Sequence, residues 1–117
     1  RIMSLKLPKE ERIYKQRDID NLFSGYKTIV NHPFKAHFKQ NSLPHSRILI
    51  SVPKKLFKKA VDRNLLKRRI RESYRHLKDE FLQDCNVDIL FVYISKEIYD
   101  FEFIKCKIGE ILKKVSR

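Results

Sequence analysis

The sequence predicts a single α+β domain, in which helices cover one face of a small mixed β-sheet. The first observation is size, because 117 residues, of which 42% are hydrophobic, suit one domain with a modest core. The second is periodicity, since apolar residues recur at helical spacing in some segments and alternate in others. The third is the order of those segments, α-β-β-(β)-α-β-α, in which one short strand is an addition to the clearer ones. The domain is expected to span residues 1–117.

The N-terminal segment combines an arm with a short helix. Residues 1–13 mix basic and apolar side chains and are expected to form a loosely held arm. A helix is expected over residues 18–24, because the apolar residues of this segment share one face. Gly25 follows in the place of a left-handed helix cap. The apolar residues of this face are Ile19, Leu22 and Phe23.

Alternation predicts the strands that follow. Residues 34–39 form a strand, and residues 27–31 are expected to form the extra strand that leads into it. After a turn-rich loop, residues 47–53 form another strand, which Pro53 ends because proline has no amide hydrogen to donate. The first of these strands carries Phe34, Ala36 and Phe38 on one face and Lys35, His37 and Lys39 on the other; the last carries Ile48, Ile50 and Val52 on one face.

The C-terminal half is predicted to form a long helix, a central strand and a last helix. The long helix covers residues 59–82, and its apolar stripe is Leu66, Ile70, Tyr74, Leu77 and Phe81. The nearly continuous apolar run at 87–95 predicts a strand that is buried on both faces, at the centre of the sheet. Asp100 is expected to cap the last helix. That helix carries Ile104, Ile108, Ile111, Leu112 and Val115.

Net charge narrows the class of partner. The chain has 27 Lys and Arg against 14 Asp and Glu, which gives a formal net charge of +13. A domain this basic repels itself unless a polyanion neutralises it, so nucleic acid is the leading partner and an anionic membrane surface the second. A basic protein without such a partner is disfavoured because the charge is clustered. No apolar run approaches the roughly 18 residues that span a bilayer. The two cysteines fit a reduced, cytoplasmic interior.

A second stripe on the long helix is basic and lies beside the apolar one. Its members recur at helical spacing: Arg63, Lys67, Arg71, Arg75 and Lys78. Like charges at this spacing destabilise an isolated helix by roughly 0.2–0.5 kcal/mol per pair. A phosphate backbone would remove that repulsion, since Arg can hold phosphate through two parallel hydrogen bonds. Asn64, which lies among these cations, is equally compatible with an RNA contact and with a helix-start role.

The segment 54–75 carries an ordered motif, which reads Lys54-Lys55, Ala60-Val61, Arg63-Asn64, Lys67-Arg68, Arg71-Glu72, Tyr74 and Arg75. This motif resembles the signature of the bacterial ribonuclease P protein family. Length, charge and element order fit that family as well, so the resemblance covers nearly the whole chain. Two positions depart from the pattern, because Leu65 stands where the family has Arg and no glycine precedes Ala60. One RNA contact is therefore expected to be missing or moved.

The resemblance implies both a fold and a function. In this family a small protein assists a large catalytic RNA, which removes the 5′ leader of precursor tRNA with Mg²⁺ that the RNA holds. The resemblance also implies a left-handed β-α-β crossover, against the common right-handed rule, and a monomer bound one-to-one to the RNA. The residues that it assigns to the catalytic RNA are Lys54, Lys55, Lys59, Arg63, Asn64, Lys67, Arg68, Arg71 and Arg75.

By the same resemblance, a cleft between the first helix and the sheet holds the single-stranded leader. Bases stack on aromatic faces with little sequence preference, and strand lysines would follow the phosphates. The alternation favours core packing for Phe34, whereas His37 shares its face with two lysines and is expected to face RNA. The residues that the resemblance assigns to the leader are Ile19, Phe23, Phe34, Lys35, His37 and Lys39.

The sequence shows no constellation that would form a protein active site. The four histidines have no metal-ligand spacing with one another or with either cysteine. Asp18 and Asp20, next to Arg17, are interpreted as residues that stabilise a helix start, and Asp88 as structural. The chemistry is therefore expected to belong to the RNA. A general RNA-binding module, such as a ribosomal or RNA-chaperone protein, is the alternative, and a protein-only nuclease would need clustered carboxylates.

Overall fold

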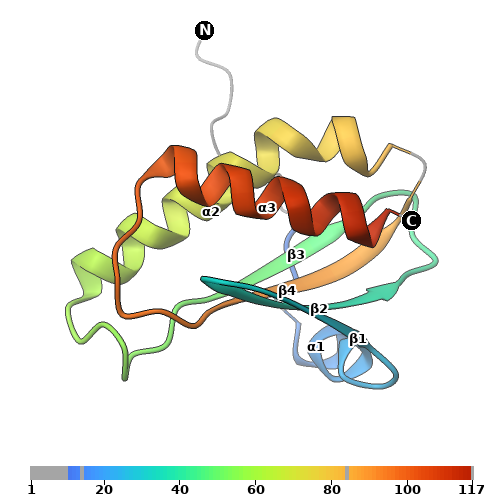
Figure 1. Cartoon of the computed structure of the whole chain (residues 1–117). Helices are drawn as coiled ribbons and strands as arrows, with labels where there is room; N and C mark the ends of the chain where they lie inside the picture. Colours follow the sequence, from blue (N-terminus) through green and yellow to red (C-terminus); the bar gives the residue numbers. More distant parts are fainter. Residues whose placement is uncertain (1–10, 14, 84, 117) are drawn as a thin grey trace, which may run out of the picture.

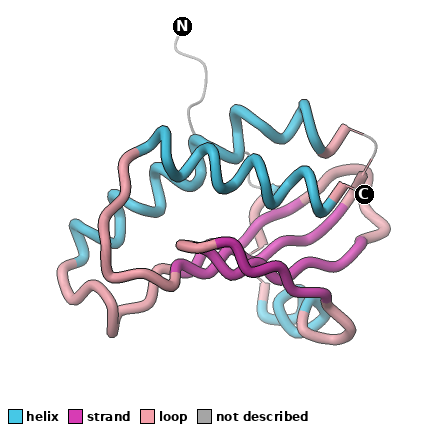
Figure 2. Tube along the Cα trace, viewed as in Figure 1, coloured by secondary structure: helices cyan, strands magenta, loops and turns pink. Residues whose placement is uncertain are grey.

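The computed structural model describes residues 11–13, 15–83 and 85–116 and has the predicted α+β architecture (Figure 1). The strand expected at 27–31 is present. Figure 2 shows the long helices on one side of the sheet and the short helix on the other. In chain order the elements are α1 (Gln16–Leu22), β1 (Lys27–Asn31), β2 (Phe34–Gln40), β3 (Arg47–Ser51), α2 (Ala60–Phe81), β4 (Val87–Tyr93) and α3 (Phe101–Val115).

The sheet is mixed, with the strand order β1-β2-β4-β3. β4 pairs antiparallel with β2 and parallel with β3, so it lies inside the sheet, and six of its seven residues are buried. The prediction of a central strand at 87–95 is confirmed. The connection from β3 through α2 to β4 crosses above the sheet in the left-handed sense (Figure 1), which departs from the usual right-handed rule.

The main core lies between the sheet and the helices α2 and α3. Three residues of the apolar stripe of α2, Leu66, Ile70 and Tyr74, are fully buried there. α3 adds Ile104, Ile108, Ile111, Leu112 and Val115 to the same cluster. These residues are the ones that the periodicity predicts.

A smaller core lies on the opposite face of the sheet, beneath α1. Leu22 of α1 packs there with Ile13 and with Leu90 of β4. The prediction that helices cover only one face is therefore wrong for α1. The reason is that β4 is apolar on both faces, and each of these faces needs a cover.

The segment before α1 is held more firmly than predicted. Residues 1–10 of the expected arm lie outside the described residues. Within residues 11–13, the Ile13 amide donates to the Ile48 carbonyl at 2.8 Å, and Arg12 forms an isolated bridge with the same strand residue. Ile13 is buried. The loose arm therefore does not include these three residues, which lie along the edge of β3.

Two helix boundaries show the local chemistry expected from the sequence. Asp100 precedes α3, and its Oδ1 accepts a hydrogen bond from the Phe103 amide at 2.9 Å. Gly25 has a φ of 92°, the left-handed conformation expected for it. α1 begins at Gln16 after Lys15, so Asp18 lies in its first turn and not at its cap. Across the described ranges, no helix has the length and hydrophobicity that crossing a membrane requires.

Candidate nucleic-acid interface

The cations of α2 form a basic face beside its buried apolar stripe. We define the basic face of α2 as Arg63, Lys67, Arg68, Arg71, Arg75 and Lys78. Because Leu66 and Ile70 are fully buried against the sheet, the helix is fixed in rotation, and the stripe predicted from the spacing lies at the edge of this contact. The sequence thus places these cations correctly, but it does not show which of them remain free.

At the C-terminal end of the basic face, acidic residues neutralise the charge. Arg75 Nη2 lies 2.6 Å from Glu72 Oε1, and His76 Nε2 lies 3.4 Å from the same oxygen. Lys78 forms an ion pair with Glu11, from the segment that runs along β3. The positive potential that a phosphate would meet here is therefore weaker than the sequence suggests.

The middle of the basic face has no such compensation. In the part of the chain that the structure describes, Lys67, Arg68 and Arg71 have no ion pair with a carboxylate. Burial lowers the pKa of Arg71, and the charges of Arg12 and Arg68 lower it further. Arg71 keeps its charge, but burial and the neighbouring cations make that charge energetically costly in the free protein, and a bound phosphate would offset the cost.

Arg12 is a member of this cluster that the sequence analysis missed. It lies outside α2, in the segment assigned to a loose arm. The segment is instead fixed to β3 by the backbone bond of Ile13, which brings the charge of Arg12 close enough to act on Arg71. A long-range contact of this kind leaves no signal in the local sequence.

The N-terminal end of the basic face organises the loop that enters the helix. Arg63 Nη1 donates to the carbonyls of Phe57 and Lys58, at 2.8 and 2.9 Å. Arg63 is therefore also a structural residue, and Arg63→Ala is expected to disturb the loop as well as any RNA contact. The lysines of this loop predicted to meet RNA are all exposed: Lys54, Lys55 and Lys59.

Asn64 is exposed and lies inside α2, beyond the helix start. The N-cap of α2 is Lys59, and no side chain caps the helix. The helix-start interpretation of Asn64 is therefore wrong. Its side-chain amide can both donate and accept hydrogen bonds. A contact between Asn64 and RNA therefore stays a prediction.

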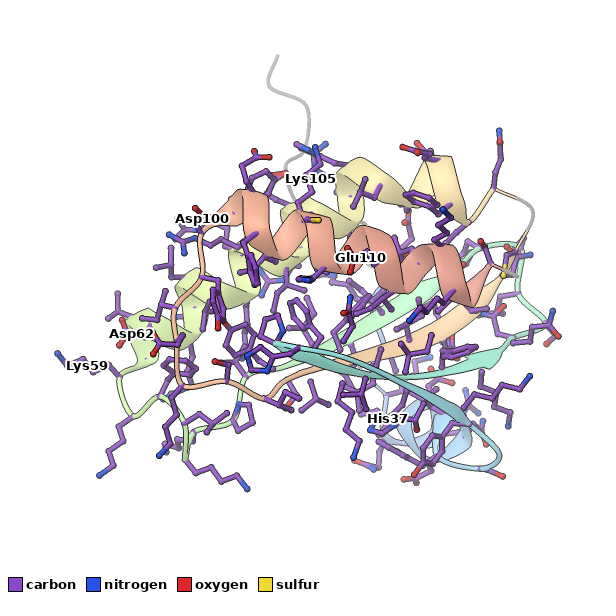
Figure 3. The ribbon with its side chains drawn as sticks, in the orientation of Figure 1. His37, Lys59, Asp62, Asp100, Lys105 and Glu110 are labelled. Atoms are coloured by element: carbon purple, nitrogen blue, oxygen red, sulfur yellow. The ribbon has the colours of Figure 1, made fainter. Side chains whose placement is uncertain are left out.

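A second candidate surface lies on the α1 side of the sheet, where Figure 3 shows His37 next to α1. In the register of β1 with β2, Thr28 faces His37 and Val30 faces Lys35, so these four residues share a face. Val30 is 62% exposed, which is unusual for a valine in a sheet. This face is therefore only partly covered by α1.

Three aromatic rings gather at this surface. The ring centroid of Tyr26 lies 4.8 Å from that of His37 and 5.4 Å from that of Phe23, both at nearly right angles. Phe23 and His37 lie 5.9 Å apart. We call this group the ring cluster. The sequence analysis predicted Phe23 and His37 but missed Tyr26, whose only signal is an aromatic residue directly after the turn glycine.

His37 is held in the ring cluster by a hydrogen bond between its Nδ1 and Thr28 Oγ1, at 2.9 Å. Burial lowers the pKa of His37, and the nearby charge of Lys35 lowers it further. His37 is therefore neutral near pH 7 and offers a ring face and a hydrogen-bonding nitrogen, not a fixed charge.

The other residues assigned to the leader occupy different environments. Lys39 Nζ donates to the carbonyls of Asn21 and Ser24 at 3.1 and 2.6 Å, so it fixes the end of α1 and has little capacity left for phosphate. Ile19 packs half-buried against the small core under α1. Phe34 is fully buried in the main core, on the opposite face of the sheet from His37. The structure thus contradicts its assignment to the leader and agrees with core packing.

The carboxylates near α1 belong to a structural ion network. Arg47 donates to Asp88 through Nε and Nη2, at 2.9 and 2.7 Å, and to Asp18 through Nη1 at 2.9 Å. The hydrogen bond to Asp88 raises the pKa of Arg47. The structural interpretation of Asp88 fits this network. Asp18 joins α1 to β3 in addition to lying in the first turn of its helix.

Metal coordination is another chemistry that clustered carboxylate, imidazole or thiol groups would indicate. Within the described ranges, no three His, Cys, Asp or Glu side chains are grouped so that they could hold a metal ion. The two surfaces consist of cations, amides and aromatic rings, which bind phosphate and bases.

Comparison with known proteins gives a consistent match. A family model described as Ribonuclease P matches residues 7–116. The ribonuclease P protein component of Porphyromonas gingivalis is 33% identical, over 94% of this chain and 86% of its own length. The component from Petrotoga mobilis is 32% identical, over 93% of this chain and 92% of its own length.

Solved structures match over the same range. The RNase P protein of Thermotoga maritima superimposes with a TM-score of 0.78 at 32% identity, covering 90% of this chain and 97% of that one. The RNase P protein of Staphylococcus aureus superimposes with a TM-score of 0.77 at 28% identity, covering 92% and 98%. The matched range contains both the basic face of α2 and the ring cluster.

Proposed function

This chain belongs to the ribonuclease P protein family, and from that premise we propose that it binds the catalytic RNA subunit and the 5′ leader of precursor tRNA. As a ribonuclease P protein component, it works with an RNA subunit in an endoribonuclease that processes tRNA.

The basic face of α2 supports the contact with the catalytic RNA. The observation that carries this assignment is the uncompensated group Lys67, Arg68 and Arg71, next to Arg12. Phosphates placed among these cations would remove their mutual repulsion and release counterions. The exposed loop lysines and Asn64 extend the same surface towards the start of α2. Arg75 and Lys78, which already have acidic partners, would contribute less.

The α1 side of the sheet supports the contact with the leader. Phe23 is exposed, His37 is neutral, and Lys35 is exposed on the same strand face as His37. Aromatic rings would stack on unpaired bases while Lys35 approaches a phosphate. Ile19 supports this surface from beneath, and Lys39 holds α1 in place.

The hydrolytic step itself is assigned to the RNA subunit. Leader removal uses Mg²⁺, which stabilises charge on the phosphate oxygens, and we place the ion among RNA phosphates. The protein would then act as a monomer bound one-to-one to the RNA, in the cytoplasm, without an active site of its own. A general RNA-binding module would not require the ordered match at 54–75.

The test is the affinity of the protein for its RNA subunit at several salt concentrations. Arg71→Ala is expected to weaken binding by about 10- to 150-fold, because one charge-assisted phosphate contact contributes ~1.5–3 kcal/mol. The slope of log affinity against log salt should fall by about one unit. Lys113→Ala is the charge-matched control, since Lys113 is exposed on α3, away from the basic face.

Thermal melting of each variant separates binding from folding. Equal affinity losses for Arg71→Ala and Lys113→Ala would show that only net charge matters. An affinity that does not change with salt would argue against phosphate contacts altogether.

A further inference from the structure

The ring cluster exposes more aromatic surface than folding needs. Phe23 is 45% exposed and Tyr26 is 41% exposed, although large rings usually lie inside a protein. The two rings are neighbours, at a centroid distance of 5.4 Å. They therefore form a contiguous aromatic feature and not two scattered side chains.

The positions of the rings are fixed before any ligand arrives. Lys39 holds the carbonyls of Asn21 and Ser24, on either side of Phe23. Gly25 provides the left-handed turn that brings Tyr26 back over the sheet. Thr28 fixes the His37 ring against which Tyr26 packs. A preformed platform loses little conformational entropy when it binds a flat ligand.

The geometry of the cluster leaves ring surface available. Tyr26 meets both Phe23 and His37 at interplanar angles near a right angle, 85° and 83°. In such edge-to-face pairs only one of the two rings presents its face to the other, so faces remain free for stacking. Phe23, at the end of α1, is the single ring that the α1 segment supplies to this surface, because Ile19 on the same helix face is not aromatic.

The charge around the cluster favours a ligand that carries phosphate. Lys35 shares the strand face of His37, and its charge is the one that acts on the His37 ring. No carboxylate of the described residues acts on His37 in this way. Exposed rings next to an unpaired cation are the features that bind single-stranded nucleic acid, in which bases and phosphates alternate.

We propose that Tyr26 is a nucleobase-stacking residue, which forms with Phe23 the platform for one unpaired base of the 5′ leader. The adjoining phosphate lies towards Lys35. This inference rests on the proposed function. It identifies the turn between α1 and β1 as the place where one leader base unstacks from its neighbours and stacks on the protein.

The experiment uses the complex of this chain with its RNA subunit. Precursor tRNAs carry the fluorescent base 2-aminopurine at one leader position at a time, and fluorescence is read in a stopped-flow instrument before cleavage. Stacking on Tyr26 should quench one position most strongly. In Tyr26→Leu that quenching is lost, and the enzyme concentration for half-maximal single-turnover cleavage rises at least about fivefold. Tyr26→Phe, which keeps the ring, should behave like the wild type.

Phe103→Leu is the matched control, because Phe103 is also an exposed ring, 36% accessible, but lies on α3 across the sheet. It should change neither readout, and mature tRNA without a leader should bind Tyr26→Leu and wild type equally. The inference fails if the wild-type complex processes the precursor while Tyr26→Leu retains both quenching and half-maximal concentration. If the wild-type complex does not process the precursor at all, the proposed function fails, and the inference falls with it.

Discussion

Individual side chains of α2 differ in how far the sequence predicts their role. The spacing of Arg71 and Arg75 places both on one stripe, which the structure confirms. Whether each cation is free to bind phosphate depends on the carboxylates that lie near it. The local pair of Arg75 with Glu72 was open to prediction, whereas that of Lys78 with Glu11 joins residues 67 positions apart and was not. The same long-range placement adds Arg12 to the site.

Long-range contacts also limit what the sequence predicts at the proposed leader surface, which consists of the ring cluster and Lys35. Alternation along β2 correctly puts His37 on the face opposite Phe34, and the sequence favoured core packing for Phe34. Tyr26 was missed because it belongs to a turn, where no periodicity indicates which way a side chain points. Its contact with His37 depends on the register that pairs β1 with β2.

His37 gives a test of the leader surface through its pKa. Burial and Lys35 lower this pKa below its ordinary value of 6.5. As pH falls through 6.5, the unfolded chain therefore takes up a proton before the folded chain does, and the free energy of unfolding decreases in that window. His37→Gln should remove this part of the pH dependence.

Nuclear magnetic resonance of the His37 ring measures the effect directly. The free protein should titrate below 6.5, and a bound single-stranded RNA oligonucleotide should raise the pKa, because phosphate favours the charged ring. An unchanged pKa on binding would contradict a position next to the leader backbone.

At the scale of elements, periodicity predicted nearly all of the fold. The helices at 60–81 and 101–115 and the central strand follow from their apolar spacing, because their faces differ strongly in polarity. The apolar spacing did not predict on which face of the sheet α1 lies. An apolar run such as β4 needs cover on both faces but does not show which helix provides it.

Replacing each of the two glycines by alanine is expected to change the free energy of unfolding in opposite directions. Gly109 lies inside α3, where a Cβ would meet Leu77 Cδ1 at 3.5 Å, an ordinary contact. Gly109→Ala should therefore stabilise the protein by about 0.5–1 kcal/mol, through helix propensity. Gly25→Ala should destabilise it by about 1–2 kcal/mol, because φ is 92° there. Urea unfolding of both variants measures these changes, and a loss of stability in Gly109→Ala would mean that α3 packs more tightly on α2 than described.

The whole molecule places its two candidate surfaces on different sides. Figure 1 shows α2 above the sheet and α1 below it. The basic face belongs to α2, whereas the ring cluster includes His37, which Figure 3 shows next to α1. Figure 3 shows Lys59 at the far end of α2 from the region of His37. One small chain can therefore contact a large RNA on one side and a leader strand on the other. The net charge of +13 suits this arrangement, since both proposed ligands are polyanions.

We expect the uncompensated part of the basic face, Lys67, Arg68 and Arg71, to serve the catalytic RNA. The most direct test of this role is cleavage of a 5′-leader precursor tRNA at low, near-physiological Mg²⁺, with limiting protein. The reactions contain RNA subunit alone, protein alone, both together, and RNA subunit with an Arg68→Ala/Arg71→Ala protein. Strong cleavage is expected only with both wild-type components, and the deficit of the variant should disappear at high protein concentration, because only binding is weakened. Cleavage by protein alone, or full stimulation by the limiting variant, would contradict the account.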